Sequence, residues 1–343
     1  SVIDPPENRI LWYPFSNAFM AGRVLVTDPS NVGINSFVVG YESRAKGNYS
    51  QAMGYKAYAD GSSSTSIGQN SSAGGDNSYA IGQEATANAP MSYSLGRGAT
   101  VHAEGENSYA IGNNASVSSV SGYAIGTNAA TTSDNAVSIG TSSMAMNNDA
   151  YAFGQSAVAA GIESYAIGKN AKADSTASYG YAFGQEAWSK GPESYAIGRA
   201  AATEEAATYG YAIGKNAKVM SPSGYALGTG AVSSGENSVA IGSTSSTYGA
   251  NSYAFGQSAN TGSDGTNAYA IGTGARANGQ ESYSIGAAAQ ATGQESYSIG
   301  AGAQAIGAQS YAIGRGASTT SNNAVSIGTS SMAMNNDAYA FGQ

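Results

Sequence analysis

Apolar and polar positions along this chain follow one short phrase that returns at a nearly fixed spacing. "SYAIG" occupies residues 78–82, and near copies such as "GYAIG", "AYAFG" and "SYSIG" recur through the sequence. The glycine that ends the phrase, here called the marker glycine, occurs 22 times, at 17 intervals of 14 residues and four of 16. A globular domain does not keep such a register, so the spacing indicates a repeat array.

Bulky and small residues alternate within the phrase. The position before the marker glycine is large and apolar in all 22 copies, the next one back is alanine or serine in 21, and the third is tyrosine in 16. A period of two predicts a short β-strand whose alternate side chains point to opposite faces. The residues that represent this structural repeat are Tyr79, Ile81, Gly82, Tyr109, Ile111, Gly112, Tyr165, Ile167, Gly168, Tyr195, Ile197 and Gly198.

A second, weaker alternation follows the marker glycine, as in "QEATAN" (83–88) and "TGARAN" (273–278), and predicts a second strand. Ten copies carry another glycine seven residues after the marker, among them Gly47, Gly61 and Gly161. Because glycine tolerates positive φ, we expect the two glycines to form the two corners of one coil. The predicted fold is therefore all-β, a parallel solenoid of 14-residue coils, with 16 residues in some.

A coil of this size is too thin to bury both faces of its strands. The pattern leaves open whether the Ala/Ser row or the Tyr/Ile row lines the narrow lumen. In either case a single chain would expose a long apolar stripe, and such stripes usually mark association. We expect several copies to associate along the array with cyclic symmetry.

Composition narrows the classes of function. The net charge of −8 argues against nucleic acid as a partner, and no run of 18 apolar residues predicts a membrane-spanning helix in this segment. There is no cysteine, and the one histidine, His102, has no evident base–nucleophile pairing. We therefore predict no catalytic residue, no metal site and no cofactor, and a protein that is not an enzyme.

Residues 1–33 do not repeat and contain four prolines and several aromatic residues, among them Trp12 and Phe15. We expect this segment to be an N-terminal cap or lead-in that covers the first coil. Residues 34–343 form the repeat array. Thr320–Gln343 copies Thr132–Gln155 with one change, so we expect a fragment of a longer fibre that continues past residue 343.

Candidate contact residues lie where the repeat is irregular or carries an unusual side chain. The 16-residue intervals predict bulges at coil corners, and His102 lies on one of them. Trp188 follows an alanine of the second strand, so the alternation turns its indole outward beside Lys190. An indole there can stack on a sugar ring, and packing between chains is the alternative. We predict Trp188, Lys190 and His102 as target contacts.

The phrases "ENSYAIG" (106–112) and "ENSVAIG" (236–242), in phase over residues 34–343, resemble the YadA-like head repeats of trimeric autotransporter adhesins. The resemblance implies a left-handed parallel β-roll and a homotrimeric fibre. It also implies an extracellular, cell-surface head that binds host matrix or other cell surfaces. This chain departs from the family by carrying tyrosine where valine is common.

Two functions from different classes remain. The first is a non-enzymatic trimeric adhesin head that presents a surface to a cell-surface glycan or matrix protein. The alternative is the structural shaft of a phage or injection-system tail fibre, with binding carried by a separate tip. Scattered threonines disfavour an ice-binding solenoid, and the lack of clustered acids and bases disfavours a polysaccharide lyase.

Overall fold

A computed structural model describes residues 8–24, 26 and 28–342. The chain divides into two compact units, residues 1–170 and 171–343. Both units consist of β-strands, and the helical structure in the described residues is the short 3-10 helix η1 (Pro29–Asn31). Over these same residues, no helix has both the length and the apolar character needed to cross a bilayer.

The first unit begins with a hairpin. Strand β1 (Arg9–Tyr13) pairs antiparallel with β2 (Ala18–Arg23), and β2 then pairs in parallel with β3 (Phe37–Tyr41). In that pairing Gly22 lies opposite the marker residue Gly40 and, like it, has positive φ. The parallel stack therefore begins at β2, inside the segment expected to be a non-repeating lead-in, of which residues 1–7 lie outside the described part.

Each later coil of the first unit contains a refrain strand, which carries the repeated phrase, and a shorter strand. The refrain strands are β3, β5 (Gln51–Tyr55), β7 (Thr65–Ile67), β9 (Tyr79–Ile81), β11 (Tyr93–Leu95), β13 (Tyr109–Ile111), β15 (Tyr123–Ile125), β17 (Val137–Ile139), β19 (Tyr151–Phe153) and β21 (Tyr165–Ile167). The shorter strands are β4 (Arg44–Ala45), β6 (Tyr58–Ala59), β8 (Ser72–Ala73), β10 (Thr86–Ala87), β12 (Thr100–Val101), β14 (Ser116–Val117), β16 (Ala130–Thr131), β18 (Met144–Ala145) and β20 (Val158–Ala159).

The second unit is built in the same way. Its refrain strands are β23 (Tyr181–Phe183), β25 (Tyr195–Ile197), β27 (Tyr211–Ile213), β29 (Tyr225–Leu227), β31 (Val239–Ile241), β33 (Tyr253–Phe255), β35 (Tyr269–Ile271), β37 (Tyr283–Ile285), β39 (Tyr297–Ile299), β41 (Tyr311–Ile313), β43 (Val325–Ile327) and β45 (Tyr339–Phe341). Its shorter strands are β22 (Lys172–Ala173), β24 (Trp188–Ser189), β26 (Ala202–Thr203), β28 (Lys218–Val219), β30 (Val232–Ser233), β32 (Ser246–Thr247), β34 (Asn260–Thr261), β36 (Arg276–Ala277), β38 (Gln290–Ala291), β40 (Gln304–Ala305), β42 (Ser318–Thr319) and β44 (Met332–Ala333).

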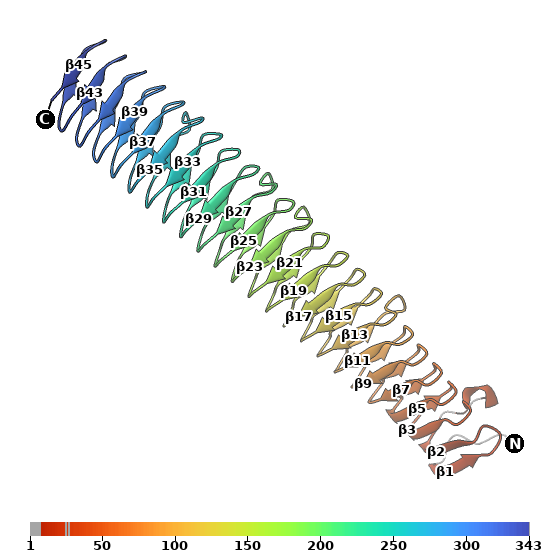
Figure 1. Cartoon of the computed structure of the whole chain (residues 1–343). Helices are drawn as coiled ribbons and strands as arrows, with labels where there is room; N and C mark the ends of the chain where they lie inside the picture. Colours follow the sequence, from red (N-terminus) through yellow and green to blue (C-terminus); the bar gives the residue numbers. More distant parts are fainter. Residues whose placement is uncertain (1–7, 25, 27, 343) are drawn as a thin grey trace. The chain divides into compact units, whose positions relative to one another are not determined.

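Apart from β1, the strands of each unit form two parallel sheets, because each strand pairs with its equivalent in the next coil (Figure 1). Tyr79 lies opposite Tyr93, and Tyr93 lies opposite Tyr109. Their rings stack face to face, with centroids 4.9 and 4.7 Å apart. The repeated phrase thus stacks on itself in register, and the prediction of an all-β parallel solenoid with a 14-residue period is confirmed.

The Ala/Ser row of the refrain strand faces the lumen. Ala80 and Ala110 are fully buried, as are Ala87 and Val101 of the shorter strands. The two sheets approach so closely that valine and threonine are the largest fully buried side chains in the described residues. Some lumen serines bond to the backbone, as where the Ser78 hydroxyl donates to the Gly75 carbonyl at 2.6 Å. The question that the sequence left open is answered: small residues fill the inside.

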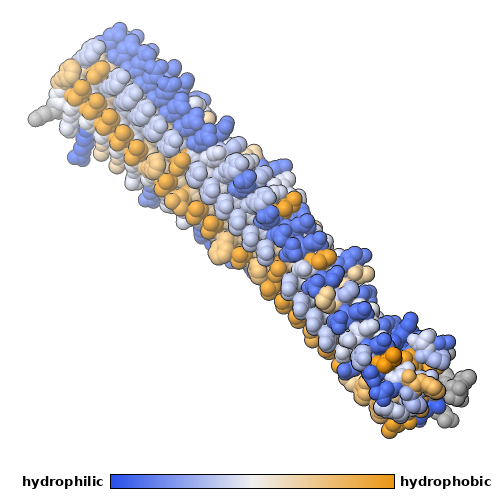
Figure 2. Space-filling model, turned by 45° about the vertical axis from the view of Figure 1, so that its right-hand side comes forward, coloured by the Kyte–Doolittle hydropathy of each residue, from blue (hydrophilic) through white to orange (hydrophobic). Residues whose placement is uncertain are grey.

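The Tyr/Ile row faces outward. Tyr79 and Ile81 are only half-buried, and Ile285 of the second unit is 38% exposed. Figure 2 shows apolar side chains gathered in a row along one side of the coils, with hydrophilic residues beside it. The bulky row is therefore the apolar stripe that a single chain leaves uncovered.

The two glycines of a coil are required for different reasons. The marker residue Gly82 has φ of 138°, as predicted, and a Cβ there would lie 2.4 Å from the Gly96 carbonyl oxygen. The prediction of positive φ at the second glycine is wrong. Gly61 lacks it, and the left-handed conformation falls two residues later, at Ser63. Gly61 is needed because a Cβ would lie 2.0 Å from the carbonyl oxygen of Gly75 in the next coil.

Candidate functional site

Two bulged coils flank Trp188 in the second unit. One bulge is a turn in which the Ala177 N–H donates to the Asp174 carbonyl at 2.9 Å, and the other joins Ala207 to Glu204 at the same distance. Each supplies the two extra residues of a 16-residue interval. Asp174 and Glu204 begin these turns just after short strands, so their side chains reach toward the coil between them, which carries Trp188.

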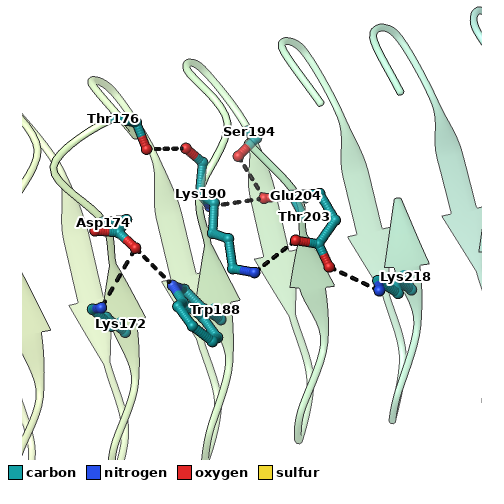
Figure 3. Close-up of polar contacts among 9 residues, drawn as sticks. All are labelled: Lys172, Asp174, Thr176, Trp188, Lys190, Ser194, Thr203, Glu204 and Lys218. Atoms are coloured by element: carbon teal, nitrogen blue, oxygen red, sulfur yellow. Dashed lines mark hydrogen bonds and ion pairs between the residues drawn. The ribbon is translucent and has the colours of Figure 1, made fainter. Parts of the chain in front are cut away.

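Trp188 lies on β24 with its indole turned outward and 38% exposed. The alternation along the second strand predicted this orientation. Its Nε1 donates to Asp174 Oδ2 at 3.3 Å, so a carboxylate of the preceding coil fixes the ring (Figure 3). The indole is thus held in place before any ligand arrives.

Two ammonium groups lie against the indole. The Nζ atoms of Lys190 and Lys172 are 4.0 and 4.9 Å from a ring centroid of Trp188, both within the range of cation–π attraction. Lys190 also pairs with Glu204 at 2.6 Å, and Glu204 pairs with Lys218 at 2.8 Å. These residues form a continuous patch of charge around one aromatic ring, here called the Trp188 patch: Lys172, Asp174, Trp188, Lys190, Glu204 and Lys218 (Figure 3).

The neighbouring groups lower the pKa of both carboxyls in the patch. Hydrogen bonds from Lys190 and Lys218 hold the pKa of Glu204 below its usual value and outweigh the effect of partial burial. For Asp174, partial burial acts to raise the pKa. The backbone N–H of Ser175, the charge of Lys172 and the indole N–H overcome that effect, so the pKa is lowered overall. Both groups therefore stay ionised at neutral pH.

Acid should release the indole. A carboxyl with a lowered folded-state pKa stabilises the fold above its unfolded pKa, and this contribution is lost as the pH falls through the folded value. We expect Trp188 fluorescence in a Trp12→Phe background to stay constant down to about pH 4, the ordinary carboxyl range, and to change below it. In the Asp174→Asn variant that change should shrink. An emission change centred near pH 6 would contradict the contact.

His102 lies in the first unit, after β12, at the start of a bulge that Gly105 closes. Its side chain is exposed, and its Nε2 lies 3.4 Å from the Ser116 hydroxyl in the next coil. No described group of three or more His, Cys, Asp or Glu residues has the arrangement needed to hold a metal ion. Of the three predicted target contacts, the structure brings Trp188 and Lys190 into direct contact.

Sequence reasoning missed Lys172, Asp174, Glu204 and Lys218. The repeat itself contained the signal, because residues one coil apart lie side by side. Lys172 pairs with Trp188, and Ala202 of the following coil pairs with Lys218. Writing the sequence in coils aligned on the marker glycine would have placed Lys172 and Lys218 in the column of Trp188, and Asp174 and Glu204 in the column of Lys190.

The same coils place a groove of about 450 Å³ along the edge of the refrain sheet. It is lined by Tyr179, Tyr181, Glu193, Tyr195, Tyr209 and Tyr211. Three of the tyrosines belong to the stacked row, and Tyr179 and Tyr209 stand at corners in the left-handed conformation. A similar groove, of about 500 Å³, follows the tyrosine row near Tyr297.

The family described as "YadA head domain repeat (2 copies)" matches eight segments, which together cover more than half of the sequence: residues 45–71, 73–100, 103–121, 118–143, 147–171, 222–245, 263–289 and 305–331. The chain belongs to the YadA head family. Among solved structures, the chain is similar to the collagen-binding domain of the Yersinia adhesin YadA. The match has 30% identity, covers 46% of this chain and 69% of that one, and has a TM-score of 0.25. No curated protein matches.

Proposed function

We propose that this YadA head forms a homotrimeric, non-enzymatic adhesin head at a cell surface and presents a binding face to glycans or matrix proteins. The observation that carries the proposal is the outward Tyr/Ile row. It runs from coil to coil within each unit, with residues such as Ile285 and Ile299 more than a third exposed. Sharing this row among three copies would bury it at every coil.

The energetics favour such sharing. Covering the exposed third of each isoleucine or tyrosine contributes roughly 1 kcal/mol by area. The contribution recurs at each coil, so association along the array is strongly cooperative. The stacked tyrosines add rigidity, because ring pairs 4.7–5.1 Å apart keep the outer row in one conformation before copies meet.

The Trp188 patch supports target binding by a different face of the coil. It projects from the shorter strand, whereas the Tyr/Ile row belongs to the refrain strand. An exposed indole between two lysines offers stacking to a sugar ring and charge to an acidic group on a glycan or a matrix protein. We assign His102 a weaker contact, since it offers a single exposed imidazole.

A binding array of glycans and matrix proteins, probed with the full chain, tests this function. We expect specific binding that falls about tenfold in Trp188→Ala, a loss of about 1.4 kcal/mol. Tyr248→Ala removes an aromatic side chain that is 49% exposed elsewhere in the second unit, and it should bind like the wild type. If the wild-type trimer binds nothing on the array, the shaft is a spacer and the adhesin assignment fails.

A further inference from the structure

The two ends of the refrain strand carry opposite charge. We call the residue two positions before the tyrosine row the leading edge, and the residue directly after the marker glycine the trailing edge. Charged leading-edge residues are Asp149, Glu163, Glu193, Glu281, Glu295 and Asp337. Charged trailing-edge residues are Arg97, Lys169, Arg199, Lys215 and Arg315.

The segregation is complete at these two positions, although the acidic residues Glu42, Glu84 and Glu186 directly follow the trailing edge. No leading-edge residue is basic and no trailing-edge residue is acidic, although the chain has 22 acidic residues against 14 basic ones. A random distribution of these charges would place acids on the trailing edge more often than bases. The pattern therefore indicates that the two edges meet surfaces of opposite sign.

These charges do not satisfy each other within one coil. Glu193 and Arg199 flank β25 at its two ends and are both exposed. The three-residue strand β25 (Tyr195–Ile197) and the corners at its two ends lie between them. Among the ion pairs of the described residues, neither takes part. Both charges are therefore available to a second molecule.

The surroundings of Glu193 suit a cation. The carboxylate lines the 450 Å³ groove between the corner residues Tyr179 and Tyr209. Burial and the adjacent tyrosines raise the pKa of Tyr211, and Glu193 contributes to the same shift, so the carboxylate acts on the groove. Aromatic rings around a carboxylate favour a guanidinium, which stacks on rings and pairs with two oxygens at once.

We propose that Arg199 of a second copy enters this groove and pairs with Glu193, so that the edges of the refrain sheet form the seams of the trimer. This inference rests on the proposed function. In a cyclic ring every contact is head-to-tail, so a leading edge meets a trailing edge. Rotation about the trimer axis does not move a residue along that axis, so each contact joins residues of the same coil in two copies.

The same geometry predicts contacts between leading-edge and trailing-edge residues in other coils. Glu163 meets Lys169 of the next copy in the first unit, a second carboxylate–ammonium pair. In the second unit Tyr209 meets Lys215, where the ring takes the place of the carboxylate. The other acidic leading-edge residues meet glutamine or alanine in their own coils. The charged contacts therefore occur at a few coils only, and they select which edge meets which rather than supplying most of the stability.

Charge reversal at this seam tests the inference. Glu193→Arg places two cations at each of three seams, and we expect the trimer dissociation midpoint, measured by sedimentation equilibrium, to shift about tenfold in concentration. Arg199→Glu should act similarly. The double variant Glu193→Arg/Arg199→Glu restores the pair and should recover most of the loss. Glu205→Arg, an exposed acid in a bulge, serves as the matched control and should have no effect.

The outcomes separate the two proposals. A wild-type trimer whose two single losses simply add in the double variant would overturn the seam while leaving the trimer intact. A monomeric wild type would remove both proposals. Circular dichroism of each variant should match the wild type, since all three positions are exposed. Weakening of the wild-type trimer by about 1 M salt, without loss of this signal, supports the seam.

Discussion

Alanine at Gly286 is expected to disrupt the solenoid locally and to lower its stability by about 4 kcal/mol, in the range of severe single substitutions. Gly286 has φ of 135°, a conformation that side chains rarely adopt. The added Cβ would lie 2.6 Å from the carbonyl oxygen of Gly300, a backbone atom of the next coil. No side-chain rotation relieves this overlap, so two stacked coils must separate. Thermal unfolding followed by circular dichroism measures the loss.

Gly274→Ala is the matched control, since it lies in the preceding coil and changes the same atoms. Its φ is 66° and nothing lies within 4 Å of the added Cβ. The equivalent residue of the next coil is Ala288, at φ of 54°. We expect a cost of about 1 kcal/mol or less. Equal losses in the two variants would show that the close contact between Gly286 and Gly300 does not set the cost.

Glutamate at Ile285 is expected to abolish trimer formation at micromolar concentration. Ile285 lies in the outward row, flanked by Ile271 and Ile299 of the adjacent coils. In the proposed trimer it is buried, so the substitution would place three unpaired carboxylates in the apolar interface, each costing several kcal/mol. The dissociation constant should rise at least about a thousandfold, and sedimentation equilibrium measures it.

Gln304→Glu controls for the added charge, because Gln304 is exposed on a shorter strand of the same unit. Its mass distribution should match that of the wild type. If Ile285→Glu remains trimeric at low concentration, the Tyr/Ile row is not the surface through which the copies associate.

The period and the alternation made most of the fold predictable. Spacing between marker glycines fixed the coil length, and the large–small–large order fixed which residues share a face. Alternation places the two sets of side chains on opposite faces of the strand, but it does not show which face points into the lumen. That choice depends on the separation of the two sheets, which admits Ala80 and Ser78 but excludes a ring such as Tyr79.

The wrong expectation for Gly61 has a similar origin. From sequence, a glycine at a corner suggests positive φ, but close approach of a neighbouring backbone is an equally good reason for its presence. Gly82 and Gly61 both lie against a carbonyl oxygen of the next coil, and only Gly82 also has positive φ. In the Trp188 patch, the orientation of the indole followed from alternation. The carboxylates of Asp174 and Glu204 come from bulges whose path the sequence did not specify.

The mass of the wild-type chain in solution shows whether three copies associate. In the proposed trimer, alanine and serine fill the lumen of each coil, and the other copies cover its tyrosines and isoleucines. Sedimentation equilibrium at micromolar concentration should give about 103 kDa, three times the 34.2 kDa of one chain. A folded, β-rich species of 34.2 kDa would contradict it.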